Sequence, residues 1–192
     1  MNIANRITMS RILLAFVFMF FLFCHGLWAK ALALFTFMLA ALSDFLDGLI
    51  AHRRNIVTDF GRLMDPIADK ILVLSAFIAF VQMQLVDAWM VVIIIFREIL
   101  ITSLRLFALN KGKVLSATRS GKHKTFSQML AIFFILCFIV LKETMLAYFT
   151  WNPSWEKLFR QGIYLLMALT VGLTLYSGLS YLWENRKIIS RL

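Results

Sequence analysis

Acidic side chains are scarce in this sequence, and so are prolines and cysteines. Only 10 of its 192 residues are Asp or Glu, and it holds two prolines and two cysteines. Both cysteines, Cys24 and Cys137, lie in apolar runs, which excludes a disulfide-stabilised secreted scaffold. The composition also excludes a disordered chain, collagen and a coiled coil. With so little proline, the long apolar runs favour uninterrupted helices.

Apolar residues dominate the composition. They make up 61% of the chain and give a mean hydropathy of +0.84, whereas a soluble domain is about 45–50% apolar. The net charge of +10 could suggest a nucleic-acid partner. In a membrane protein, however, an excess of Lys and Arg is typical of cytoplasmic loops and of contact with anionic lipids. We therefore expect a protein of the lipid bilayer with no nucleic-acid partner.

The apolar runs predict an all-α polytopic membrane protein with one domain over residues 1–192. A hydrocarbon core of about 30 Å needs about 20 apolar residues per helix. Six windows reach this length, and they are Ile7–Trp28, Ala31–Ala51, Pro66–Val86, Ala88–Leu109, Phe126–Tyr148 and Leu158–Trp183. Met1–Ser10 is expected to form a short interfacial helix before the first span. No small-x-small cleavage site follows the first window, so it is interpreted as a retained helix and not as a signal peptide.

The distribution of Lys and Arg predicts the orientation. Thirteen lie in the N-terminus, the second and fourth connections and the C-terminal tail, while four lie in the alternate connections. Because cytoplasmic loops carry the excess of positive charge, both termini are expected on the cytoplasmic side of a bacterial-type inner membrane.

Four of the ten acids lie at the facing ends of the second and third predicted helices, and they are Asp44, Asp47, Asp65 and Asp69. On the second helix the aspartates share one stripe with Gly48 and Ala51. Gly61 joins the stripe of the third helix if that helix starts near Gly61. Small residues let a ligand or a backbone approach closely. Carboxylates on facing stripes provide hard oxygen ligands, which suit Mg²⁺ or Mn²⁺ and not Zn²⁺.

Two other interpretations compete with a metal site. Interfacial acids can cap helices, and Asp65 before Pro66 resembles an N-cap followed by proline. Intramembrane acids also occur along ion or proton pathways. Such a pathway should place acids at several depths, whereas these four gather at one face.

The stretch from Asp44 to Asp69 resembles the signature of the CDP-alcohol phosphatidyltransferases, D-x2-D-G-x2-A-R-x8-G-x3-D-x3-D. Seven of its fixed positions are present, and they are Asp44, Asp47, Gly48, Ala51, Gly61, Asp65 and Asp69. One position departs from the pattern, because His52 stands where the family has arginine. Arg53 follows it, about 100° further around a helix, and the pattern leaves open whether Arg53 takes the place of that arginine.

This resemblance implies a six-helix enzyme in which the four aspartates hold two divalent metal ions, Mg²⁺ or Mn²⁺, that grip the diphosphate of CDP-diacylglycerol. It implies Asp69 as the general base that deprotonates the acceptor alcohol, with CMP as leaving group, and it suggests a homodimer. The positions expected near the nucleotide and the lipid headgroup are Asn5, Thr8, Gly48, Ala51, Arg53 and Gly61. Of these, Asn5 and Thr8 belong to a stretch that resembles the family's N-x2-T-x2-R, which ends here at Arg11.

Two further stretches bear on the acceptor. Arg97 and Glu98 lie near the middle of the fourth helix and are either a buried ion pair or ligands, while Arg105 lies near its cytoplasmic end. Lys122 and Lys124 are placed just outside the membrane, where they are either loop charges or ligands. The pair of patterns R-E-x6-R and G-K-x-K-T-x2-Q resembles the family branch that uses sn-glycerol 3-phosphate. By that resemblance the acceptor phosphate is held by Arg105, Lys122, Lys124, Arg97 and Arg119.

The expected reaction is therefore transfer of the phosphatidyl group of CDP-diacylglycerol to sn-glycerol 3-phosphate, giving phosphatidylglycerophosphate and CMP in phospholipid biosynthesis. The first alternative is another branch of the family, with inositol phosphate, serine or a phospholipid as acceptor. The second is a cation transporter, which should show acids or broken helices at the membrane midplane.

Overall fold

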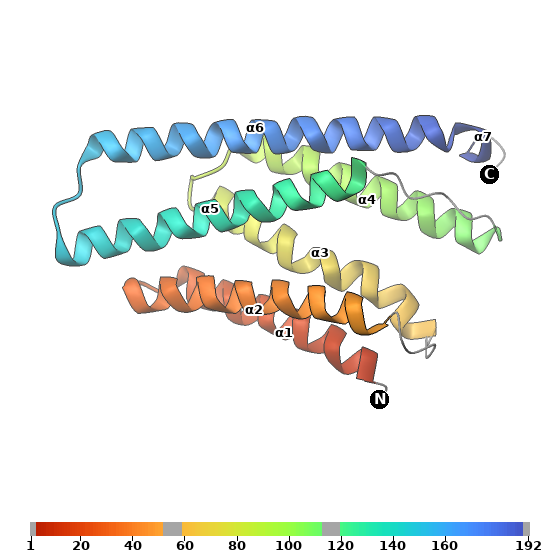
Figure 1. Cartoon of the computed structure of the whole chain (residues 1–192), viewed down its shortest axis with the longest axis horizontal. Coiled ribbons are helices and arrows are strands. Elements are labelled where there is room, and N and C mark those ends of the chain that lie inside the picture. The colour runs from red at the N-terminus through yellow and green to blue at the C-terminus, as the bar shows by residue number, and fades with distance from the viewer. Residues whose placement is uncertain (1–2, 52–58, 113–119, 190–192) are drawn as a thin grey trace.

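The computed structural model describes the backbone of residues 3–51, 59–112 and 120–189, and the side chains of residues 9–43, 70–112, 121, 123–186 and 188–189. All regular secondary structure in these residues is helical, as predicted (Figure 1). The helices are α1 (Ile3–Phe23), α2 (Leu27–Ala51), α3 (Asp59–Gln82), α4 (Ala88–Asn110), α5 (Ser120–Tyr148), α6 (Pro153–Glu184) and the short α7 (Arg186–Ile189).

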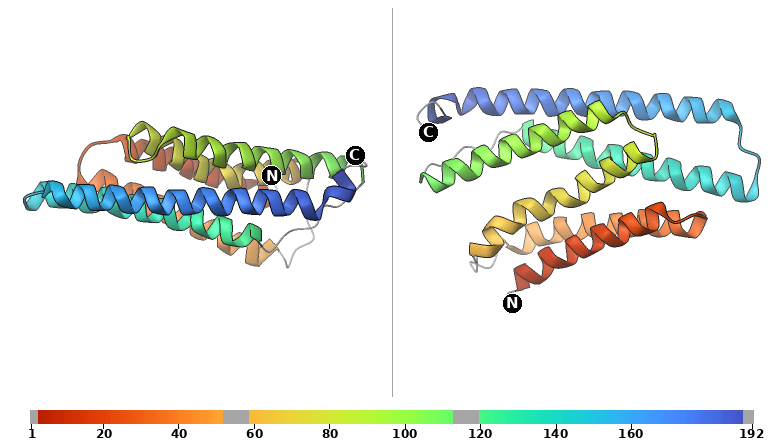
Figure 2. Two further views of the ribbon diagram at one scale, coloured as in Figure 1. Left: turned by 90° about the horizontal axis from the view of Figure 1, so that it is seen from above. Right: turned by 180° about the vertical axis from the view of Figure 1, so that it is seen from behind.

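The six long helices form a bundle in which α1 packs against α2 and α3, and α6 packs against α5 and α4. The two groups meet where α5 contacts α2 and α3 and where α4 contacts α3. The N-terminus, the last turns of α2, the first turns of α3 and the C-terminus lie at the same end of the bundle (Figures 1 and 2). The aspartate-bearing helix ends therefore lie on the side where the sequence predicts both termini. This end is called the site end below.

The turn between α1 and α2 differs from the prediction. The first helix was expected to run to Trp28, but it ends at Phe23 and Trp28 belongs to α2. Gly26 has a φ of 97°, a conformation that side chains disfavour, and it reverses the chain direction. The buried Lys30 donates from Nζ to the carbonyl of Leu22 at 2.6 Å, which satisfies one of the carbonyls left open at the end of α1.

The predicted interfacial helix at the N-terminus is wrong as a separate element. Residues from Ile3 to Phe23 form one continuous α1. Polar Asn5, Arg6 and Thr8 alternate here with apolar residues, and the stretch contains neither proline nor glycine. Nothing in its covalent structure therefore breaks the helix between its polar start and its apolar body.

The interpretation of Asp65 as a helix cap is also wrong. The third helix starts at Asp59, so Asp65 and Pro66 are its seventh and eighth residues. Proline is tolerated near a helix start because the first amides have no intrahelical acceptor, but this proline lies further in. Because α3 starts at Asp59, Gly61 belongs to the same helix as Asp65 and Asp69.

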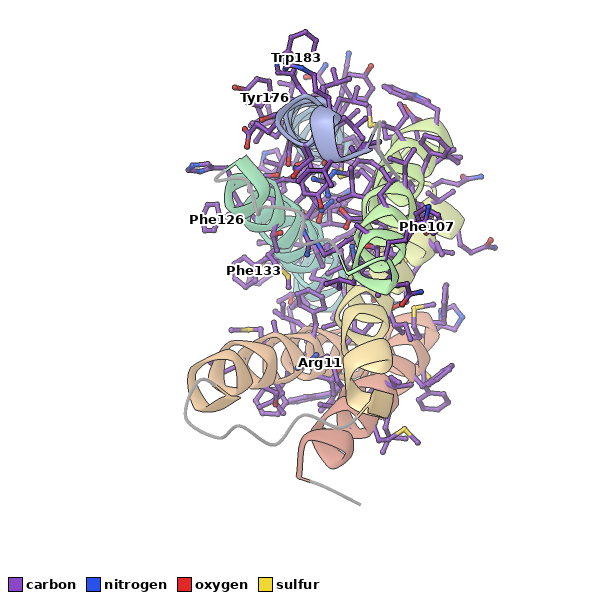
Figure 3. All side chains as sticks on the ribbon, turned by 90° about the vertical axis from the view of Figure 1, so that its right-hand side faces the viewer. Arg11, Phe107, Phe126, Phe133, Tyr176 and Trp183 are labelled. Carbon is purple, nitrogen blue, oxygen red and sulfur yellow. The ribbon has the colours of Figure 1, made fainter. Side chains whose placement is uncertain are left out.

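The surface of the bundle is strongly apolar. Large apolar side chains point outward from several helices, as Figure 3 shows for Phe107, Phe126, Phe133, Tyr176 and Trp183. A water-soluble monomer does not expose such extensive apolar area. Two described helices, His123–Tyr148 and Pro153–Glu184, are long and apolar enough to cross a membrane, and shorter apolar helices cover Met9–Phe23, Leu27–Ser43 and Lys70–Gln82. The chain is a membrane protein.

Candidate functional site

Two helix ends carry the aspartates of the predicted metal site. Asp44 and Asp47 lie in the last turns of α2, and Asp65 and Asp69 lie in the first turns of α3. Both helix ends lie at the site end of the bundle (Figure 1). The side chains of these four residues lie outside the described part of the structure, as do those of Asn5, Thr8, Gly48, Ala51, Gly61 and Lys122. His52, Arg53 and Arg119 lie outside the described residues altogether.

The donor chemistry of these helix ends fits a divalent cation. Aspartates three residues apart on α2 and four residues apart on α3 lie on a common face of each helix. Four carboxylates provide only oxygen donors, which Mg²⁺ and Mn²⁺ accept. A cation also offsets the mutual repulsion of four negative charges at neighbouring helix ends.

A buried charged cluster continues from α3 into the bundle. Glu98 of α4 accepts from Nζ of Lys70 in α3 at 2.5 Å, and it forms an ion pair with Lys124 of α5. Nη1 of Arg97 lies 3.5 Å from its Oε1, and Gln128 of α5 donates to the same oxygen at 3.5 Å. We call these five residues the Glu98 cluster. One carboxylate thus joins three helices.

The Glu98 cluster is withdrawn from solvent and biased toward positive charge. The side chains of Glu98 and Lys124 are 7% and 6% exposed, whereas that of Lys70 is 29% exposed. Even without Lys70, two cations share a single carboxylate among the described side chains. Because a buried charge is costly unless it is paired, such a place favours an additional anion.

Arg97 extends this network to α6. Its Nη2 donates to the hydroxyl of Ser177 at 2.8 Å, and a Cβ added at Gly178 would lie 3.1 Å from its Cγ. The absence of a side chain at Gly178 therefore makes room for Arg97. The face of α6 around Ser177 is buried and polar, and it comprises Thr170, Thr174, Ser177 and Tyr181. Among the described side chains, Nε of Arg97, the Thr174 hydroxyl and the Tyr181 hydroxyl are buried without a hydrogen-bond partner.

The predicted acceptor-phosphate residues are brought together only in part. Arg97 and Lys124 meet at Glu98, while Arg105 is exposed and lies over the ring of Tyr181, with its Cζ 5.8 Å from the ring centroid. Arg97, Arg105 and Tyr181 nevertheless all belong to the packed pair α4 and α6. The described basic residues therefore line the contact of these two helices and continue to α5.

For two basic residues the surface interpretation offered by the sequence is wrong. Lys124 was either a loop charge or a ligand, and it is no loop charge, because it is a buried residue in the second turn of α5, which starts at Ser120. Arg11 could also be interpreted as a side chain that extends to the membrane interface. It is instead 6% exposed and points into the space between α1, α2 and α3 (Figure 3). Both side chains belong to the interior of the bundle, where their charge can act on a ligand or on a neighbouring helix.

The sequence analysis missed Lys70, and it considered Glu98 only together with Arg97. A signal for them exists in the sequence, because neither has an opposite charge three or four residues away on its own helix. A charge in an apolar helix without such a partner has to be paired from another helix. Here the two residues pair with each other.

A second charged cluster at the opposite end of the bundle serves as a contrast. Glu156 of α6 pairs with Lys142 of α5 at 3.1 Å and with Arg160 at 3.1 Å, and it accepts from Nε1 of Trp151 at 3.1 Å. Arg160 also donates to the carbonyl of Gln84 in the α3–α4 turn at 2.9 Å. Glu156 is more exposed than Glu98, and its contacts tie the α5–α6 connection to the α3–α4 turn.

Comparisons with known proteins place the chain among phosphatidyltransferases. A family model described as CDP-alcohol phosphatidyltransferase matches residues 1–175. The chain is 38% identical over 143 residues to the CDP-diacylglycerol–glycerol-3-phosphate 3-phosphatidyltransferase of Bacillus subtilis, covering 68% of this chain and 74% of that protein. It is 38% identical over 135 residues to the protein of the same name from Cereibacter sphaeroides, covering 68% of this chain and 61% of the relative. It is 39% identical over 134 residues to a probable phosphatidylglycerophosphate synthase of Mycobacterium tuberculosis, covering 68% and 64%.

A family match over residues 1–175, together with the signature from Asp44 to Asp69, defines the class of this protein. The chain belongs to the CDP-alcohol phosphatidyltransferase family.

Proposed function

We propose that this protein transfers the phosphatidyl group of CDP-diacylglycerol to sn-glycerol 3-phosphate and releases CMP. The proposal rests on one observation, which is that the aspartate signature and the Glu98 cluster use neighbouring residues of α3. The signature ends at Asp69, and the next residue, Lys70, belongs to the buried basic Glu98 cluster. An acidic segment suited to metal ions thus adjoins a basic one suited to a phosphate-bearing acceptor. The names of the relatives support the same reaction.

Asp69 acts as the general base in this proposal. Its carboxylate takes the proton from the primary hydroxyl of glycerol 3-phosphate, and the freed oxygen forms a bond to the phosphorus that carries diacylglycerol. The bond from that phosphorus to the oxygen of CMP breaks, and CMP leaves with the electron pair. The base has to lie within hydrogen-bond reach of the hydroxyl, which requires that the acceptor be fixed near the start of α3.

The aspartates Asp44, Asp47, Asp65 and Asp69 would hold the divalent cations. When bound, such cations neutralise the charge of the diphosphate and stabilise the departing CMP. The small residues Gly48, Ala51 and Gly61 leave room for the nucleotide to approach the helix backbones. Lipid tails require that the site open to the bilayer, and a site at the ends of membrane helices meets that requirement.

The Glu98 cluster and the adjoining α4–α6 contact would receive the phosphate of the acceptor. Lys124 and Arg97 provide charge-assisted donors, which make shorter and stronger hydrogen bonds than neutral ones. Arg105 lies at the outer edge of the same helix contact. An excess of cations over carboxylates favours an acceptor that carries a phosphate over serine. The family match favours a transferase over the cation transporter.

The reaction is tested with the purified full-length protein, CDP-diacylglycerol, Mg²⁺ and a panel of alcohols, with CMP release as the measured signal. We expect release with sn-glycerol 3-phosphate, none with unphosphorylated glycerol, and loss of release after EDTA that excess Mg²⁺ or Mn²⁺ restores. CMP release only with serine or inositol phosphate would overturn the choice of acceptor. If none of the alcohols supported metal-dependent CMP release, the transferase activity itself would be overturned.

We also propose six membrane-crossing helices with the site end in the cytoplasm. The distribution of Lys and Arg supports it, as does the common position of both termini (Figure 1). In a variant with Cys24 and Cys137 replaced by serine, a cysteine at the exposed Asn110 should react with an impermeant maleimide only after the cells are opened. A cysteine at the exposed Ser154, in the first turn of α6, should react in intact cells. The reverse pattern would contradict this orientation.

A further inference from the structure

We propose that Glu98 is a positioning residue that holds Lys124 and Lys70 in place for the phosphate of the acceptor. This inference rests on the proposed function and adds a residue to it, because Glu98 bears the same charge as the phosphate and does not bind it. The observation behind it is the convergence of α3, α4 and α5 on one carboxylate.

The contacts use both oxygens of Glu98. Oε2 accepts from Lys70, while Oε1 receives Lys124, Arg97 and Gln128. Since the two oxygens have different partners, the carboxylate fixes the ammonium groups of two different helices relative to each other. Gln128 donates to Oε1 without adding charge, so it helps to orient the carboxylate.

The need for such a residue follows from the flexibility of lysine. A lysine side chain loses about 2 kcal/mol of rotamer entropy when it is fixed, and binding is weaker when this loss occurs only on ligand arrival. Glu98 orders Lys124 before the acceptor arrives. A buried carboxylate also lowers the cost of placing several cations together in the bundle.

The arrangement links the acceptor side of the site to the base. Lys70 follows Asp69 directly in α3, so the contact of Lys70 with Glu98 ties the segment that bears Asp69 to α4. Lys124 joins α5 to the same carboxylate. Glu98 therefore sets the relative position of the proposed base and of the phosphate donors.

The test compares Glu98→Gln with Glu156→Gln in the full-length protein, with KM determined separately for each substrate. Glu156 is the matched control, because it also accepts from a lysine and an arginine but lies at the opposite end of the bundle. We expect Glu98→Gln to raise the KM for glycerol 3-phosphate at least about tenfold and to change the KM for CDP-diacylglycerol less than about twofold. Glu98→Asp should restore part of the loss, and Glu156→Gln should leave both KM values unchanged.

A double-mutant cycle separates positioning from general loss of structure. If Glu98 acts through Lys124, Glu98→Gln should cost far less in the Lys124→Gln background than in the wild type. If the Glu98→Gln protein does not accumulate, the test uses Glu98→Asp and Gln128→Leu instead. Each should raise the KM for glycerol 3-phosphate a few-fold and leave the KM for CDP-diacylglycerol unchanged.

The outcomes distinguish the two proposals. A wild-type protein without CMP release on glycerol 3-phosphate would defeat the proposed function itself. An active wild type whose acceptor KM is unchanged by these substitutions, or whose two KM values rise equally, would defeat only the role of Glu98.

Discussion

Asp69→Asn is expected to reduce turnover by about 10²- to 10⁴-fold, the range over which a positioned acid or base contributes to catalysis. Asparagine keeps the size of the side chain and one oxygen donor but cannot take up the proton of the acceptor hydroxyl. The residue is the eleventh of a continuous helix that starts at Asp59, so the backbone should be unaffected. CMP release under saturating substrates measures the loss.

The matched control for this variant is Asp87→Asn. Asp87 precedes α4 at the opposite end of the bundle and makes no side-chain cap hydrogen bond there. It should retain full turnover. The Asp69→Asn protein should still insert and still bind CDP-diacylglycerol, because three of the four proposed metal ligands remain. Near-normal turnover of Asp69→Asn would mean that another group removes the proton.

Lys124→Gln should raise the KM for glycerol 3-phosphate about ten- to a hundredfold. A hydrogen bond to a charged group contributes about 1.5–3 kcal/mol, and about 1.4 kcal/mol corresponds to a factor of ten. Glutamine removes the positive charge but can still donate to Glu98. The substitution should therefore weaken binding of the acceptor phosphate and leave the KM for CDP-diacylglycerol nearly unchanged.

Lys142→Gln is the control on the same helix. Lys142 also pairs with a glutamate, at 3.1 Å from Glu156, but at the other end of α5. Its substitution should leave both KM values as they are. If Lys124→Gln raised both KM values equally, or if Lys142→Gln raised the KM for glycerol 3-phosphate by the same factor, Lys124 would contribute only to the packing of the bundle.

Helix positions followed closely from the apolar pattern, because long runs without proline leave the backbone little alternative in a bilayer. The starts and ends were less accurate. The sequence placed the end of the first helix at Trp28, since Trp28 continues the apolar run, whereas the φ of Gly26 ends that helix at Phe23. Hydropathy does not register a change of backbone conformation within an apolar stretch.

The role of the aspartates as metal ligands stays a prediction, but these residues could be singled out from the sequence because they lie one helical turn apart in the same segments. The Glu98 cluster could not, since its contacts depend on how α3, α4 and α5 pack. For Lys124 in particular the sequence left a loop charge and a ligand open, because nothing in its neighbourhood in the sequence shows that Glu98 lies beside it. The unpaired charges of Lys70 and Glu98 on their own helices were the available signal.

The length of α6 bears on how the molecule stands in a membrane. Two exposed tryptophans, Trp155 and Trp183, lie near its two ends, 28 residues apart. At 1.5 Å per residue they are separated by about 42 Å along the axis, which matches the thickness of about 40–45 Å that a bilayer has when its headgroup layers are included. Because indole rings prefer that layer, we expect α6 to cross the membrane close to its normal. In that orientation Arg186, whose Cζ lies 4.4 Å from the centroid of the Trp183 ring, would lie at the depth of the lipid phosphates, on the side of the proposed site.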